Sequence, residues 1–147
     1  MFLHIKDVLT PEEITFFRQA LGPQAPWIEG ARSAGGQAIH QKNNLQLAQG
    51  SELSAQLQTM VKAALHRNAL FFSAALPRRI YNPLFNNYGD GANFYGNHVD
   101  SAVMHSKADN CWVRSDLSCT LFLTPPEDYD GGELVITETL GEKRIKL

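Results

Sequence analysis

The sequence has few cysteines and little net charge, and each of these shortages argues against a class of protein. It holds only two cysteines, Cys111 and Cys119, which are too few for a disulfide scaffold and are typical of free thiols in a reducing compartment. Neither sign of charge dominates, because 13 Lys and Arg stand against 15 Asp and Glu and the formal net charge is −2. This balance does not favour sequence-independent binding of DNA or RNA, so no nucleic-acid partner is expected.

Long hydrophobic runs are also missing. The longest apolar run, residues 69–76, falls far short of the roughly 20 residues that a membrane span needs. Lys6 and Asp7 interrupt the N-terminus before the apolar region of a signal peptide can form. We therefore expect a cytoplasmic protein with no membrane partner. A chain of 147 residues with 44% hydrophobic residues suits one globular domain.

Helix signals lie in the first half of the chain. Residues 10–13, Thr-Pro-Glu-Glu, have the pattern of a capping box with proline at the first helical position, and Gly22-Pro23 ends the apolar helical spacing that follows. A second helix is expected from near Ser51 to about Leu76, where Pro77 stops it. A short strand is expected at residues 2–5. Loop with extended pieces at 38–40 and 45–47 is expected between the helices.

Strand patterns dominate after Pro77. The segments expected to be strands cover residues 80–85, 92–99, 117–123, 133–137 and 143–147. Helices followed by strands predict an α+β fold in which helices buttress a β-sandwich or barrel. Residues 78–147 number only 70, whereas an eight-stranded jelly roll needs about 80–100, so we expect an incomplete sheet. An open strand edge of this kind would favour a homo-oligomer.

The pair His98-x-Asp100 is the strongest candidate for chemistry. On a strand, residues i and i+2 point to one face, so an imidazole nitrogen and a carboxylate oxygen would converge on one point. A histidine from another strand would complete a 2-His-1-carboxylate face, which leaves open positions on Fe(II). Taken without its surroundings, the tripeptide is short and common, and two unrelated polar residues near a strand end would look the same.

The motifs around the pair carry a family resemblance. A Tyr88-x-x-Gly91 turn and Tyr95, three residues before the histidine, precede it, and the strand entry Gly131-Gly-Glu-Leu134 follows it. Residues 42–47, Lys-Asn-Asn-Leu-Gln-Leu, lie upstream. Together these motifs span nearly the whole chain, which resembles the Fe(II)/2-oxoglutarate dioxygenases of the prolyl hydroxylase type and, more closely, the bacterial PKHD-type hydroxylases.

The resemblance implies one domain with a double-stranded β-helix (jelly roll) core. Residues 1–77 would be a helical support region, and residues 78–147 a partial jelly roll. The cofactors implied are Fe(II) and the co-substrate 2-oxoglutarate, with ascorbate as reductant. The implied reaction uses O₂ to hydroxylate a substrate and releases succinate and CO₂. The substrate, a small molecule or a protein, is not specified.

The resemblance also implies roles for single residues. His98 and Asp100 would be metal ligands, and the hydroxyls of Tyr88 and Tyr95 would bind 2-oxoglutarate, although either tyrosine can equally be a core aromatic. By the same resemblance, Asn97 would orient Asp100 and Arg114 would line the substrate entrance. Lys42, Asn43 and Asn44 would line the substrate mouth. Asn97 and Arg114 are open to a purely structural reading as well.

Two expected residues are missing from the sequence. In the family a distal histidine and then an arginine should follow the strand that begins at Glu133. The histidines are His4, His40, His66, His98 and His105, so none does, and Arg144 lies too early. We expect a chain that lacks its C-terminal part and alone turns over 2-oxoglutarate poorly or not at all. The alternatives are a catalytically inactive jelly-roll binding or regulatory module and a cupin-like metalloenzyme that does not use 2-oxoglutarate.

Overall fold

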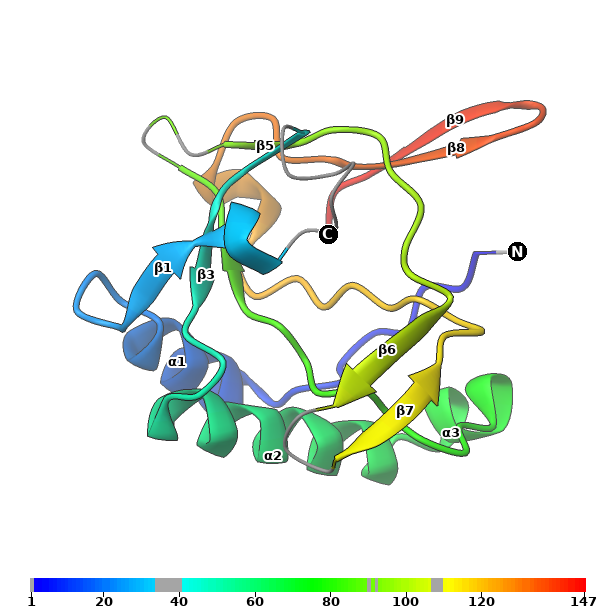
Figure 1. Ribbon diagram of the computed structural model, residues 1–147, viewed down its shortest axis with the longest axis horizontal. Coiled ribbons are helices and arrows are strands. Elements are labelled where there is room, and N and C mark those ends of the chain that lie inside the picture. The colour runs from blue at the N-terminus through cyan, green and yellow to red at the C-terminus, as the bar shows by residue number, and fades with distance from the viewer. Residues whose placement is uncertain (1, 34–40, 90, 92, 107–109) are drawn as a thin grey trace.

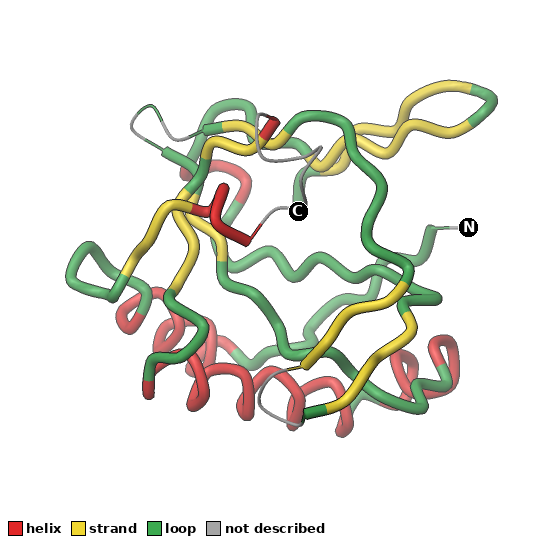
Figure 2. The backbone as a smooth tube through the Cα atoms, in the orientation of Figure 1, coloured by secondary structure: helices red, strands yellow, loops and turns green. Residues whose placement is uncertain are grey.

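The fold combines helices along one side of the molecule with short antiparallel strand pairs above them (Figures 1 and 2). It was obtained as a computed structural model, and the residues described are 2–33, 41–89, 91, 93–106 and 110–147. The helices are α1 (Pro11–Ala20), α2 (Glu52–Arg67) and α3 (Ala69–Ala75), with short 3₁₀ turns at Gly30–Ser33 and Pro126–Asp128. This mixture confirms the α+β class. No helix within these ranges is long and apolar enough to cross a membrane.

The strands are short and pair in several small sheets. They are β1 (Trp27–Glu29), β2 (Lys42–Asn43), β3 (Leu45–Leu47), β4 (Asn86–Asn87), β5 (Phe94–Tyr95), β6 (Val103–Ser106), β7 (Cys111–Arg114), β8 (Leu134–Glu138) and β9 (Gly141–Ile145). All the pairs are antiparallel, in the orders β1-β3-β4, β2-β5, β6-β7 and β8-β9. Strands from before residue 77 therefore pair with strands that follow it. The β8–β9 hairpin extends away from the remaining elements in Figure 1.

The start of α1 confirms the predicted capping box. The Thr10 hydroxyl accepts a hydrogen bond from the Glu13 backbone N–H at 3.2 Å, and the Glu13 carboxylate accepts one from the Thr10 N–H at 2.8 Å. The same carboxylate pairs with both terminal nitrogens of Arg67, which also donates to the Val8 carbonyl at 3.2 Å. Glu13 thus closes the helix end and ties α1 to the end of α2.

The second helix begins at the expected cap but is not continuous. Ser51 caps α2 by accepting from the Ser54 N–H at 3.1 Å. Asn68 then leaves the helical region and caps α3 by accepting from the Phe71 N–H at 2.8 Å. The prediction of one helix to Leu76 was wrong because an asparagine side chain competes well for backbone donors and can begin a new helix. Leu76 ends α3 with φ of 42°.

The core lies between the helices and β3. Phe17 and Leu57 are fully buried, and Leu47 from β3 is 1% exposed. The rings of Phe17 and Phe85 lie 6.0 Å apart at a tilt. The other buried apolar residues of this cluster are Leu9, Val61, Ala64 and Leu65. The strand-bearing segments are therefore anchored on α1 and α2.

Several predicted strands are not strands. The predicted strands at 133–137 and 143–147 correspond to β8 and β9, and 45–47 form β3, but residues 2–5, 80–85 and 117–123 are not strands. Within the described part of the segment 92–99, only 94–95 form a strand. The predicted piece at 38–40 lies outside the described residues. Ile80, Leu121 and Leu123 nevertheless pack against the core. Their apolar pattern reports burial correctly, because an apolar side chain can face the core without a backbone ladder.

Candidate metal centre

The predicted pair lies between β5 and β6, and residues 96–102 belong to no strand. The expectation that the pleat of a strand aligns the two side chains was therefore wrong. The side chains still converge: the His98 Nε2 atom is 3.5 Å from the Asp100 Oδ1 atom. Their orientation comes from hydrogen bonds and ring stacking.

His98 is fixed by its backbone and by an aromatic ring. Its Nδ1 atom lies 2.7 Å from the Gly96 carbonyl oxygen. A carbonyl only accepts, so Nδ1 carries a hydrogen and Nε2 is the ring nitrogen that faces Asp100. The ring stacks on Tyr95 with the centroids 3.7 Å apart and the planes 14° apart. This is the arrangement of a metal-ligating histidine whose other nitrogen is held by a carbonyl.

The carboxylate of Asp100 is held from another part of the chain. The Ser118 hydroxyl donates to Oδ2 at 2.7 Å, while Oδ1 faces His98. Sequence reasoning missed this role of Ser118, because the residue lies 18 positions from Asp100 and no local pattern connects the two. Asn97, which was predicted to orient Asp100, is exposed.

The donor set fits a divalent metal ion in part. An ion about 2.1 Å from each atom separates two ligands by about 3.0–3.4 Å, close to the spacing of His98 Nε2 and Asp100 Oδ1. An imidazole nitrogen and a carboxylate oxygen are two of the three ligands of a 2-His-1-carboxylate iron site. Within the described part of the chain, no group of three or more His, Cys, Asp or Glu residues could hold a metal ion. The described residues therefore supply two ligands.

The upstream motif supports the pair through β5. Lys42 and Tyr95 are partners in the β2–β5 register, and the Lys42 Nζ atom lies 5.0 Å from the centre of the Tyr95 ring. The Gly96 N–H donates to the Gln41 carbonyl at 2.7 Å, so the residue whose carbonyl holds His98 is itself anchored. Burial lowers the pKa of Lys42, and burial together with the charge of Asp100 raises the pKa of Tyr95.

Alternate residues of the same motif form a buried polar row. Asn44 and Gln46, 3% and 1% exposed, both donate to the side-chain oxygen of Asn86, at 3.1 and 3.0 Å. Burial raises the pKa of the Tyr88 hydroxyl, while a hydrogen bond with Asn44 opposes that shift. Asn43 is exposed, and its side chain donates to the Gly91 carbonyl at 2.7 Å. The row thus links β3 to the segment that leads to His98.

Two further side chains lie on the β6–β7 hairpin. Arg114 ends β7 and forms an exposed ion pair with Asp116 at 2.7 Å. His105 is on β6, where its ring packs edge-on against Trp112 with centroids 4.9 Å apart.

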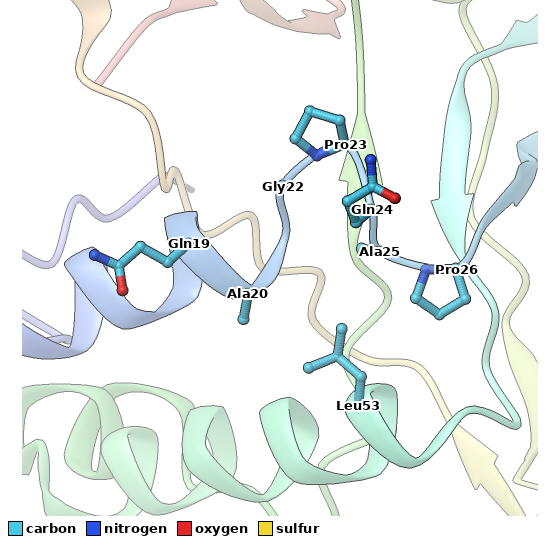
Figure 3. Close-up of a pocket in the computed structure, with 8 residues that line it drawn as sticks. All are labelled: Gln19, Ala20, Gly22, Pro23, Gln24, Ala25, Pro26 and Leu53. Atoms are coloured by element: carbon cyan, nitrogen blue, oxygen red, sulfur yellow. The ribbon is translucent and has the colours of Figure 1, made fainter.

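A surface cleft is found elsewhere in the fold. It has a volume of about 300 Å³ and lies between the end of α1, the loop after it and the start of α2 (Figure 3). Its lining residues are Gln19, Ala20, Gly22, Pro23, Gln24, Ala25, Pro26 and Leu53. The lining includes no titratable side chain and none of the residues around His98, so the cleft offers no acid, base or metal ligand.

Comparison with curated proteins identifies relatives over the whole chain. The sequence is 52% identical over 147 residues to a PKHD-type hydroxylase of Variovorax paradoxus and 49% identical to one of Polaromonas. It is 50% identical to the PKHD-type hydroxylase YbiX of Shigella dysenteriae. Each alignment covers 100% of this chain and 64% of the relative. No protein-family model matches the chain.

All three of these relatives are named PKHD-type hydroxylases. The resemblance drawn from the motifs is confirmed: the chain is a homologue of the PKHD-type hydroxylases along all its 147 residues. It spans about 64% of the length of the curated relatives it matches.

Proposed function

We propose that this chain is part of an Fe(II)- and 2-oxoglutarate-dependent hydroxylase in which His98 and Asp100 are two of the three protein ligands of the iron. The observation that carries the proposal is the 3.5 Å approach of His98 Nε2 to Asp100 Oδ1. The other polar atom of each side chain, His98 Nδ1 and Asp100 Oδ2, is already hydrogen-bonded. The hydroxylase names of the relatives support it. The same proposal includes a single domain built around a double-stranded β-helix core.

The chain's own residues would orient the two metal ligands. Gly96 and Tyr95 hold the His98 ring, and Ser118 holds the Asp100 carboxylate. Bound Fe(II) with 2-oxoglutarate and O₂ supplies the oxidising chemistry that hydroxylates a substrate C–H bond and releases succinate and CO₂. Tyr88 and Tyr95 are proposed to bind 2-oxoglutarate, and Asn97 and Arg114 to contact the substrate or support Asp100. The substrate is proposed to be a small molecule or a protein.

Anaerobic titration with Fe²⁺ tests the proposal. Binding should shift the NMR signals of the His98 ring protons, and His98→Ala should remove most of the affinity measured by calorimetry. Adding 2-oxoglutarate should tighten Fe²⁺ binding, because its keto-acid oxygens occupy open positions on the ion. Unchanged Fe²⁺ affinity in the His98→Ala variant would exclude His98 as a ligand. Fe²⁺ binding that ignores 2-oxoglutarate would favour the binding-module or cupin-like alternative.

A further inference from the structure

Ser118 and Asp100 are joined across a long stretch of chain. They are 18 residues apart, and the β6–β7 hairpin lies between them. The hairpin folds back on itself in a regular register, and the Ser115 N–H donates to the Ala102 carbonyl at 2.8 Å just before Ser118 is reached. Ser118 therefore reaches Asp100 only because the hairpin closes.

The carboxylate of Asp100 needs a partner if it is to keep one orientation. The terminal torsion of an aspartate is broad and roughly two-fold, so its two oxygens exchange places easily. Asp100 is also 56% exposed, which leaves room for that rotation. A hydroxyl that donates to a carboxylate oxygen forms a short, charge-assisted hydrogen bond. The 2.7 Å bond from Ser118 to Oδ2 is of this kind, and it leaves Oδ1 turned toward His98.

We propose that Ser118 is a positioning residue of the metal centre. Its hydrogen bond keeps Oδ2 of Asp100 out of the coordination, so that Oδ1 is the ligand oxygen. The inference rests on the proposed metal site, and it adds a residue that does not itself touch the metal. Hydrogen-bond partners of metal ligands typically change metal affinity by 10- to 100-fold. Loss of the Ser118 hydroxyl should weaken metal binding by about that factor.

A purely structural role makes different predictions. If Ser118 only staples the ends of the hairpin, its removal lowers the stability of the metal-free protein, and any loss of metal affinity follows from that. If Ser118 positions the carboxylate, the metal-free protein keeps its melting temperature and the hydroxyl alone decides the affinity. Threonine carries the same hydroxyl and separates the two roles.

The experiment is a titration with Co²⁺, a stand-in for Fe²⁺ that is stable in air, followed through the NMR shifts of the His98 ring protons. Wild type is compared with Ser118→Ala, Ser118→Thr and Ser115→Ala. The last is a matched control, since it removes a hydroxyl from the same segment and keeps the backbone bond to Ala102. Thermal unfolding of each metal-free variant is measured in parallel.

We expect Ser118→Ala to raise the Co²⁺ dissociation constant about 10- to 100-fold, with an unchanged metal-free melting temperature. Ser118→Thr and Ser115→Ala should stay within a few-fold of wild type. The inference is overturned if Ser118→Ala binds Co²⁺ as tightly as wild type. It is also overturned if Ser118→Thr does not restore the affinity and both Ser118 variants have a lowered metal-free melting temperature. If the His98 ring of wild type does not respond to Co²⁺, the metal centre itself fails, which is a separate and distinguishable result.

Discussion

Replacement of Gly30 by alanine tests whether the buried polar row is as tightly packed as the structure shows. The Gly30 N–H donates to the Asn44 carbonyl at 2.8 Å, so the two backbones lie close together. A Cβ atom on Gly30 would lie 2.9 Å from the Asn44 Cγ atom and 3.0 Å from its carbonyl oxygen, and closer still to Oδ1. Asn44 is 3% exposed and bonded to Asn86, so it cannot move aside freely.

The cost can be estimated from two effects. Overpacking a buried site costs about 1–3 kcal/mol. Displacing Asn44 from Asn86 adds about 1 kcal/mol for the lost hydrogen bond. We expect Gly30→Ala to lower the free energy of unfolding by about 2–4 kcal/mol, a large part of the about 5–15 kcal/mol of a typical domain. Urea unfolding followed by circular dichroism measures it.

Two further variants make the test specific. Gly50→Ala is the matched control, because a Cβ there meets nothing within 4 Å, and its stability should stay within about 0.5 kcal/mol of wild type. In the Asn44→Ala background, Gly30→Ala should cost about 1 kcal/mol or less, because most of the clash is gone. A Gly30→Ala variant as stable as wild type, or an equal cost in both backgrounds, would refute the reasoning.

Three other perturbations follow from the structure. Glu13, whose pKa the Arg67 guanidinium lowers to about 2, contributes stability that is fully present above its ordinary pKa of 4.5 and is lost as the pH falls toward 2. The melting-temperature difference between wild type and Glu13→Gln should therefore shrink over that interval. Phe17→Ala should cost about 3–5 kcal/mol in urea unfolding, because the ring is fully buried. Tyr95→Leu should weaken Co²⁺ binding at His98 by removing the stacked ring, whereas Tyr95→Phe should not.

Each of these has a result that contradicts it. A Glu13→Gln difference that stays constant from pH 5 to pH 2 would mean that the ion pair with Arg67 does not form in solution. A Phe17→Ala variant within about 1 kcal/mol of wild type would place the ring outside a packed core. Equal Co²⁺ affinity in the two Tyr95 variants would show that ring stacking does not orient His98.

Several local features of this protein follow from the sequence alone. The cap at Thr10, the start of α2 after Ser51 and the β8 strand all occur where the pattern predicted them. A cap depends on residues three positions apart, so neighbours along the chain suffice to predict it. The resemblance to the PKHD-type hydroxylases also came from the motifs alone, and the relatives confirm it.

The candidate site was predictable only in part. His98 and Asp100 were named from a two-residue spacing, and they do approach each other. The reason given was wrong, because no strand aligns them. Predicted strands such as 80–85 failed for a related reason: an apolar pattern reports which side chains face the core, but the backbone partner comes from elsewhere in the fold.

Composition, helix ends, family resemblance and the identity of the central pair were thus determined by the sequence. The tertiary structure alone decided that Ser118 holds Asp100, that Lys42 lies against Tyr95, and that Asn44 packs on Gly30. These contacts join residues far apart in the chain. They form only when the intervening segments fold back and the core packs, and no local pattern of residue types records that closure.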